Sequence, residues 1–433
     1  MNCNLRIEKM VQGGEGMARL EDGRICFVQG ALPGELCKVE ILRDRKDFTR
    51  GRAVQILEPS PDRAEPKCPR YGRCGGCSLQ HLDSEKQARY LEQVERENFR
   101  RISHAELPGD FKIHVGPAWG YRNRARVVFE ARGGKVLYGF RRQDSNELET
   151  FESCPVLTPA INKFLKEHAE KLYAKMLEDQ GNFEKAFHKK YPRGNARRFQ
   201  KSQELELNVF DNGRGEISYY YKAMSDRDFE ARSVSVTDVD GHRVRSDASV
   251  FFQSNLSLLP QLVRSVQAAV DEGIASGAAS DEWLIDLYSG VGLFAVVLRD
   301  RFKRITTVEL NKNCLKHAKV NLGDYSDSGM EQVPNASLLE NVSAPAEEWL
   351  ADHVIDVPAT LIVDPPRTGL LPSALEAIVK SSVNRLVYVS CDPVTLARDY
   401  AKFSAAGFSL KKAEGFAFYP QTPHLEMLFV LAR

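Results

Sequence analysis

The stretch WLIDLYSGVGLFA, residues 283–295, is the part of the sequence that decides the fold of the C-terminal half. A short apolar run leads directly into a turn that contains Gly290 and Gly292. In a strand-to-helix turn, a Cβ atom at these positions would obstruct a ligand that approaches the backbone. The stretch therefore predicts the first strand and the ligand-binding turn of an α/β sheet.

Short apolar segments of this kind recur through the C-terminal part of the chain, from about residue 245 to residue 433. Helical patterns there separate short apolar segments, which are WLIDLYS, ITTVEL, TLIVDPP, RLVYVSC, FAFYP and MLFVLAR. This alternation is typical of a doubly wound, Rossmann-like sheet, in which ligands bind outside the carboxyl ends of the strands. We expect the functional side chains at those ends.

The first part of the chain has a different pattern. Residues 1–58 contain short alternating segments separated by QGGEG, EDG and LPGE, which predict a small β-barrel. Residues 59–244 begin with a Pro- and Gly-rich break, continue with a helix from Ser84 to about Arg101, and then show hairpin signals. These signals lie at Gly133–Gly134, DNGRG and Asp240–Gly241, and they predict a mixed α+β middle domain.

The net charge of +1 gives no overall sign of nucleic-acid binding, so only local patches are informative. The runs RDRKDFTRGR (43–52) and KAFHKKYPRGNARRFQK (185–201) combine cations with aromatic residues, which can hold phosphates and stack bases. A solvated surface is the alternative for both runs. Without an apolar signal segment or a membrane-length apolar run, the chain is expected in the cytoplasm.

Three acidic residues accompany the glycine turn. Glu309 closes the next strand, 309 − 290 = 19 residues after Gly290, where a carboxylate can bind ribose hydroxyls. Asp286 precedes the glycines and Asp364 ends another strand, and both suit a ligand with ammonium and hydroxyl groups. GVGLFA also fits the dinucleotide fingerprint, so an NAD-dependent oxidoreductase stays open at this point.

A candidate nucleophile and two candidate bases lie near the end of the chain. Cys391, in VSCDP, follows an apolar strand and precedes a helix, and helix N-terminal amides stabilise a thiolate. His424 and Glu426 come immediately before the last strand, and either could be a general base.

Four of the nine cysteines form a pattern. Cys68, Cys74 and Cys77 have the spacing CxxxxxCGGC, and Cys154 follows in ESCPV. Four thiolates suit either an iron–sulfur cluster or structural zinc. The other cysteines outside the active site are expected to pack as ordinary small residues; they are Cys3, Cys26, Cys37 and Cys314.

SCDPVTLARD, with DPPR upstream and HLEM downstream, is similar to the RNA uracil-5-methyltransferase family, and CxxxxxCxxC is similar to its ribosomal branch. The resemblance covers nearly the whole chain. It implies a TRAM-type, OB-like barrel at 1–58, an iron–sulfur-containing middle domain at 59–244, and a Rossmann-like S-adenosylmethionine-dependent methyltransferase domain at 245–433.

The resemblance also assigns roles to residues. It implies Cys391 as the nucleophile, Glu426 as the base, and a [4Fe-4S] cluster on Cys68, Cys74, Cys77 and Cys154. The implied cofactor-binding residues are Gln253, Tyr288, Gly290, Glu309, Asn341 and Asp364. The chain departs from the family at Leu293, where Asn is expected, and at Asp392, where SCDP replaces SCNP. We expect the Asp392 carboxylate to point away from the thiol.

The implied reaction moves a methyl group from S-adenosylmethionine to carbon 5 of a uridine in 23S rRNA, through an adduct between Cys391 and carbon 6. Glu426 then removes the C5 proton, and the base must first leave its stack. The resemblance implies RNA as partner, with no membrane or protein partner and a monomeric chain. Alternatives are the same methylation on tRNA, an NAD-dependent oxidoreductase, and a catalytically silent iron–sulfur RNA-binding protein.

Overall fold

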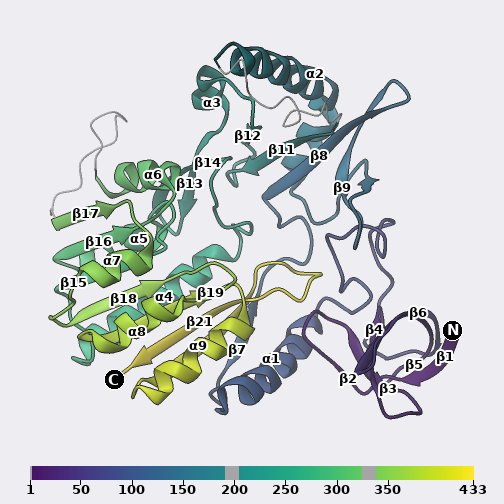
Figure 1. The fold of residues 1–433 in the computed structure, drawn as a ribbon, viewed down its shortest axis with the longest axis horizontal. Helices are drawn as coiled ribbons and strands as arrows, with labels where there is room; N and C mark the ends of the chain where they lie inside the picture. The colour runs from purple at the N-terminus through teal and green to yellow at the C-terminus, as the bar shows by residue number, and fades with distance from the viewer. Residues whose placement is uncertain (1, 191–203, 324–337) are drawn as a thin grey trace.

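The computed structural model describes residues 2–190, 204–323 and 338–433. It has three parts, seen in Figure 1 as a purple barrel, a blue-to-teal middle part and a green-to-yellow sheet flanked by helices. Among the described residues, no helix has both the length and the apolar character needed to cross a membrane. The second basic run, 185–201, lies largely outside the described residues, so its predicted role stays a prediction.

The N-terminal barrel is a six-stranded sheet with the strand order β1-β5-β6-β4-β3-β2. Its strands are β1 (Asn2–Arg6), β2 (Lys9–Met10), β3 (Gly16–Arg19), β4 (Ile25–Gln29), β5 (Leu36–Asp44) and β6 (Phe48–Glu58). Cys26 and Cys37 are fully buried in its core beside Val28 and Val39, as expected for small apolar side chains. The first basic run, 43–52, lies at the end of β5 and on β6.

The middle part contains a five-stranded sheet with the strand order β10-β9-β8-β11-β12 and a separate hairpin, β13-β14. Its elements are β8 (Arg124–Arg132), β9 (Lys135–Arg141), β10 (Leu148–Thr150), α2 (Pro159–Lys190), β11 (Glu204–Asp211), β12 (Ile217–Tyr220), α3 (Asp226–Arg232), β13 (Val234–Val239) and β14 (His242–Asp247). All three predicted hairpins form as antiparallel pairs. The apolar face of the sheet packs against α2.

The C-terminal part is an eight-stranded sheet with the strand order β17-β16-β15-β18-β19-β21-β20-β7. Strands β15 to β19 are parallel, whereas β21 runs antiparallel to both of its neighbours. The strands are β15 (Trp283–Leu287), β16 (Arg304–Val308), β17 (Leu338–Val342), β18 (Ala359–Val363), β19 (Val383–Ser390), β20 (Ser409–Ala417), β21 (Glu426–Ala432) and β7 (Lys112–Val115). The predicted doubly wound sheet is confirmed, although β7 and β17 were not predicted.

Helices cover both faces of this sheet. They are α1 (Gln87–Ser103), α4 (Leu259–Ala275), α5 (Leu293–Leu298) with the 3₁₀ turn η2 (Arg299–Arg301), α6 (Lys312–Leu322), α7 (Ala346–Asp352), α8 (Pro372–Lys380) and α9 (Pro393–Ala405). Helix α1 lies against α9, and β7 extends the sheet beside β20 (Figure 1). Residues 87–115, which were expected in the middle domain, therefore pack on the C-terminal sheet. The boundaries of the three predicted domains stay predictions.

Candidate active site

A cavity of about 520 Å³ opens at the carboxyl ends of the parallel strands. Seven of the eight predicted catalytic and cofactor residues line it. They are Gln253, Tyr288, Gly290, Glu309, Asp364, Cys391 and Glu426. These residues come from the loop before α4, the β15–α5 turn, and the ends of β16, β18, β19 and the start of β21. The fold thus brings together side chains that are up to 426 − 253 = 173 positions apart in sequence.

The glycine turn after β15 has backbone angles that favour glycine. Gly290 and Gly292 have φ of 55° and 82°, and Tyr288 adopts a φ of 59° beside them. A Cβ at Gly290 would meet no atom within 4 Å, whereas one at Gly292 would lie 3.3 Å from Cβ of Ala318. The space at Gly290 fits the predicted approach of a ligand, but Gly292 instead allows α6 to pack closely.

Glu309 stabilises the same turn from the neighbouring strand. Its Oε2 accepts a hydrogen bond of 2.9 Å from the Gly290 N–H, and its Oε1 accepts one of 2.6 Å from the Asn311 N–H. This arrangement fixes the carboxylate at the edge of the cavity. A ligand hydroxyl could donate a hydrogen bond to the remaining lone pairs of the Glu309 carboxylate.

Several buried polar atoms around the cavity have no hydrogen-bond partner in the described part of the chain. They are Gln253 Oε1, Asp286 Oδ1, Ser289 Oγ and Glu426 Oε2. Buried polar atoms normally find partners, because leaving one unpaired costs about 1–3 kcal/mol. The orphaned atoms fit a polar ligand that would supply the missing partners.

Acidic side chains dominate the electrostatics of the cavity. Burial raises the pKa of Asp364 to about 7 and, together with Asp364 and Glu309, raises the pKa of Asp286 to about 8. Burial and then Asp364 raise the pKa of Glu426 well above its ordinary value, and Arg367 opposes this shift. A cationic ligand would lower all three pKa values, so the cavity is suited to a positively charged molecule.

Cys391 lies between β19 and the first turn of α9. Burial, followed by Glu426 and Asp364, raises its pKa to about 11, while Arg367 lowers it. A backbone hydrogen bond also lowers this pKa, in the direction predicted for helix amides, but desolvation and the two carboxylates outweigh it. As predicted, Asp392 points away: its Oδ1 accepts a 3.0 Å hydrogen bond from the Thr395 N–H and caps α9.

The two candidate bases differ in their positions. Glu426 lines the cavity together with Cys391, whereas His424 is not among the lining residues. Burial, then Arg367 and Arg122, lower the pKa of His424, and its ring faces Tyr419 edge-on. The geometry therefore favours Glu426 as the base.

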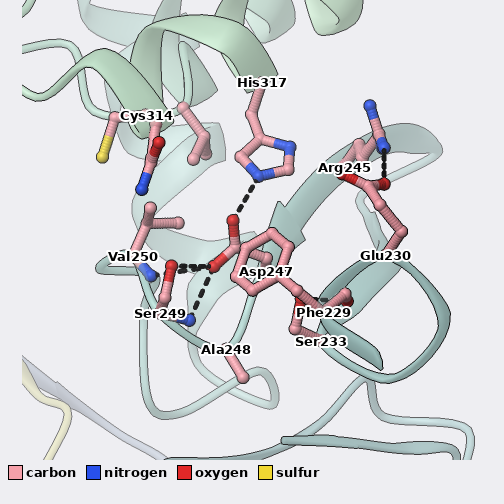
Figure 2. A network of polar contacts seen from close by, with 12 residues as sticks. Phe229, Glu230, Ser233, Arg245, Asp247, Ala248, Ser249, Val250, Cys314 and His317 are labelled. Carbon is pink, nitrogen blue, oxygen red and sulfur yellow. Dashed lines mark hydrogen bonds and ion pairs between the residues drawn. The ribbon is translucent and has the colours of Figure 1, made fainter. Parts of the chain in front are cut away.

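A buried polar network supports one wall of the cavity (Figure 2). His317 Nε2 on α6 lies 2.6 Å from Oδ2 of Asp247, and the Asp247 Oδ1 accepts hydrogen bonds from the Ser249 N–H, the Ser249 hydroxyl and the Val250 N–H. Asp247 thus joins α6 to the loop that leads to Gln253. Cys314, one helical turn before His317, lines the cavity.

Some predictions differ from the structure. Asn341 lies on β17, where its Oδ1 accepts a 2.7 Å hydrogen bond from the Thr307 hydroxyl, and it is not among the residues lining the cavity. Leu293 lines the cavity and is buried, so an apolar contact replaces the amide expected there. Sequence reasoning missed Arg367 and Cys314 as cavity residues, although Arg367 ends the quoted DPPR motif.

The four predicted metal ligands lie in two loops, one before α1 and one before α2. Burial and then neighbouring thiols raise the pKa values of Cys74, Cys77 and Cys154, with that of Cys77 reaching about 12, so the four side chains are close enough to interact electrostatically. However, within the described residues no group of three or more His, Cys, Asp and Glu side chains is arranged to hold a metal ion. The iron–sulfur cluster stays a prediction.

Comparisons with known proteins agree with this architecture. Residues 4–54 match the TRAM domain, and residues 91–433 match the model of the tRNA (Uracil-5-)-methyltransferase family. The crystal structure of Pyrococcus abyssi tRNA (uracil-54, C5)-methyltransferase in complex with S-adenosyl-L-homocysteine has the same fold, with a TM-score of 0.66 and 21% identity over 99% of this chain and 100% of that chain.

Full-length relatives are also found. The 23S rRNA (uracil(1939)-C(5))-methyltransferase RlmD of Methylococcus capsulatus is 30% identical over 447 residues, covering 99% of this chain and 96% of the relative. An uncharacterized RNA methyltransferase of Treponema denticola is 30% identical over 448 residues, covering 99% and 98%. The chain therefore belongs to the tRNA (uracil-5-)-methyltransferase family and is an S-adenosylmethionine-dependent RNA (uracil-C5)-methyltransferase with an N-terminal TRAM domain.

Proposed function

We propose that this enzyme methylates carbon 5 of a specific uridine in 23S ribosomal RNA, with Cys391 as nucleophile and Glu426 as base. The observation that carries this proposal is that one cavity contains both side chains together with five of the six predicted donor-binding residues. The full-length similarity to a relative named for 23S rRNA supports the ribosomal substrate. Such an enzyme would act in the cytoplasm, as expected from the sequence.

The reaction begins at Cys391. Its thiol loses a proton to solvent, and the sulfur forms a bond to carbon 6 of the uracil while the C5=C6 π electrons move toward carbon 5 and the C4 carbonyl. S-adenosylmethionine, when bound, supplies a methyl group on a positively charged sulfur. Carbon 5 takes this methyl group, and the electrons of the broken methyl–sulfur bond remain on the sulfur of the donor.

Glu426 completes the reaction. Its carboxylate takes the C5 proton, the electrons of the C5–H bond restore the C5=C6 double bond, and the bond between carbon 6 and Cys391 breaks with its electrons returning to sulfur. Burial raises the pKa of Glu426, and a nearby cation favours the ionised form that acts as the base. Arg367 already supplies one positive charge beside both Cys391 and Glu426.

RNA binding would involve the TRAM barrel. A cavity of about 640 Å³ between the barrel and the cysteine loop, residues 68–82, is lined by Arg50, Arg52 and Tyr71. Both arginines belong to the predicted basic run 43–52. Cations beside an aromatic ring suit a phosphate backbone with a stacked base, so we propose that the RNA passes here.

The four cysteines would hold a [4Fe-4S] cluster. The donor set fits, because four thiols lie within electrostatic range of one another and the Gly76 N–H is 3.4 Å from Cys74 Sγ. Four thiols suit structural zinc as well, and the resemblance of CxxxxxCxxC to the ribosomal branch favours the iron–sulfur cluster. The cluster would have a structural or RNA-positioning role and take no part in methyl transfer.

The test uses the purified enzyme, labelled S-adenosylmethionine, and unmodified 23S rRNA or tRNA. We expect labelled 5-methyluridine at one position of 23S rRNA, no transfer with Cys391→Ala, and a covalent adduct between the wild-type protein and 5-fluorouridine RNA. Label in tRNA alone would overturn the ribosomal substrate. Normal turnover by Cys391→Ala would overturn the covalent mechanism.

A further inference from the structure

The loop that leads to the catalytic base is held from outside its own sheet. This loop, residues 418–425, connects β20 to β21, and β21 begins at Glu426. In Figure 1 the yellow loop extends away from the sheet toward the other two parts of the molecule. The Asn255 Nδ2 donates to the Phe418 carbonyl at 3.1 Å, and the Tyr121 hydroxyl donates to the Pro420 carbonyl at 2.9 Å.

Gln421 is the most strongly held residue of this loop. Its carbonyl accepts hydrogen bonds from the Ser78 N–H at 3.0 Å and the Leu79 N–H at 2.9 Å. Its own N–H donates to Gln87 Oε1 at 3.0 Å, and its side-chain Oε1 accepts from Gln87 Nε2 at 3.0 Å. Only 1% of Gln421 is exposed, so these bonds form in a buried environment.

The backbone of Gln421 is also strained. Its φ is 70°, in the left-handed region that residues other than glycine rarely adopt. Such a conformation persists only where the surrounding contacts determine it, and these positions are concentrated at functional sites. The contacts that determine it here are the two backbone amides of the cysteine loop and the Gln87 side chain.

Gln87 joins three segments that are far apart in sequence. Besides its bonds to Gln421, its Nε2 donates to the carbonyls of Leu79 and Leu82 at 3.1 and 3.2 Å. It therefore holds the start of α1, the cysteine loop and the loop 418–425 in one buried cluster. Ser78 and Leu79 directly follow Cys77, so the predicted metal-binding loop contacts the base loop without an intervening element.

The TRAM barrel packs against the cysteine loop and loop 418–425. A Cβ at Gly14 would lie 2.7 Å from Leu79 Cδ2 and 3.6 Å from Pro423 Cβ. The barrel loop thus covers both the cysteine loop and the base loop, and Gly14 leaves the space that they need. Three parts of the protein meet within a few residues of the catalytic base.

We propose that Gln87 and Gln421 are positioning residues for removal of the C5 proton, with the cysteine loop as their anchor. This inference rests on the proposed function. Glu426 directly follows loop 418–425, whereas Cys391 follows β19, which pairs with β21 from Met427 onward, and precedes α9, so movement of the loop affects Glu426 more than the nucleophile. Formation of the S–C6 bond and methyl transfer should therefore continue when proton removal slows.

The test compares Gln87→Ala with Glu426→Gln and wild type in single-turnover reactions with labelled RNA. A misplacement of about 1 Å can cost about 100-fold in rate, so we expect Gln87→Ala to lower kcat roughly 10- to 100-fold while KM for RNA stays within about threefold. The methylated RNA should accumulate as a covalent protein adduct on a denaturing gel, as with Glu426→Gln.

Two further variants make the test specific. Gln421→Gly removes only the side chain at a backbone position that glycine tolerates, and should trap a smaller amount of adduct in a folded protein. Gln267→Ala is the matched control, because the Gln267 side chain donates one 3.0 Å hydrogen bond to the Val297 carbonyl away from the site and should trap none.

The outcomes separate the two proposals. If Glu426→Gln traps the adduct but Gln87→Ala and Gln421→Gly do not, the positioning role is overturned. The proposed function then stays intact. A rise in KM without trapped adduct would also overturn it, since that result indicates an RNA-binding role. If Glu426→Gln itself traps no adduct, the proposed chemistry fails, and the positioning role fails with it.

Discussion

The cavity and the cysteine loops each carry a predicted set of ligand-binding residues, but the structure arranges the two sets differently. Seven of the eight residues predicted for the cavity line one space. The four cysteines lie within electrostatic range of one another, but no set arranged for a metal ion is found in the described ranges. Under the proposed function, the scaffold preforms the cavity, whereas the bound cluster would complete the arrangement of the cysteines.

The cause lies in the elements that carry each set. Asp364 and Cys391 follow β18 and β19, whose registers are fixed by ladders of parallel pairing with their neighbours. The cysteines lie outside the named strands, in loops held by turn-type hydrogen bonds such as that from the Tyr71 N–H to the Cys68 carbonyl and that from the Cys74 N–H to the Arg70 carbonyl. Metal binding commonly supplies the missing free energy in such segments, because a preformed site rarely exists without the metal.

The largest expected effect concerns the cavity. Replacing Glu426 with Gln keeps its size but removes the proposed base, so kcat should fall by about 100- to 10,000-fold, the range for general acid–base catalysis. Single-turnover assays would show methyl transfer to RNA that stays attached to the protein. Loss of methyl transfer itself, with no adduct, would mean that Glu426 acts before the methyl step.

A second prediction tests whether the cavity wall is preformed. Asp247→Ala leaves His317 and three backbone or hydroxyl donors without their buried acceptor, so the free energy of unfolding should fall by about 3–5 kcal/mol. Denaturant titration measures this loss, and Asp247→Asn, which keeps an acceptor oxygen, should lose less. Equal losses in both variants would indicate that the charge, and not the acceptor, stabilises the wall.

The contribution of Asp247 to the stability of the folded protein should depend on pH in one direction. Burial opposes ionisation of Asp247, but hydrogen bonds from His317 and Ser249 outweigh it, so its pKa is lowered in the folded protein. Its contribution to stability is therefore present above the unfolded pKa of about 3.9 and is lost as the pH falls toward the folded value. The stability difference between wild type and Asp247→Ala should shrink below about pH 4.

A third prediction concerns the cysteine loops. Cys77→Ser should greatly reduce bound iron and acid-labile sulfide in anaerobically purified protein and lower the thermal unfolding midpoint. The half-buried Cys3, on the barrel strand β1, offers a matched control, and Cys3→Ser should keep the wild-type metal content. Stoichiometric zinc in the wild-type protein would contradict the four-iron assignment.

Sequence periodicity was sufficient for the main sheet and the three hairpins, because apolar strands and glycine turns carry local signals. It was insufficient for β7, a four-residue strand whose side chains are only partly buried or exposed, and whose place beside β20 depends on the long-range packing of α1 on α9. β17 was missed for a similar reason, since its residues are half-buried or exposed.

Sequence motifs predicted most of the residues that line the cavity, but not their electrostatics. Motif positions place Cys391 and Glu426 at strand ends, whereas their pKa values depend on burial and on distances to Asp364 and Arg367. Likewise, the contacts of Gln421 with Ser78, Leu79 and Gln87 join residues more than 330 positions apart, and no local sequence pattern predicts them.

The smallest expected effect tests the electrostatic balance of the cavity. Arg367 lowers the pKa values of both Cys391 and Glu426, and each group must lose a proton to act. Arg367→Gln should raise both pKa values, shift the rising limb of the pH–rate profile to higher pH, and slow turnover roughly several-fold at neutral pH. Arg367→Lys keeps the positive charge and should stay near wild type. If Arg367→Gln loses the same factor at every pH, Arg367 acts by contacting the RNA and not by stabilising the thiolate and the carboxylate.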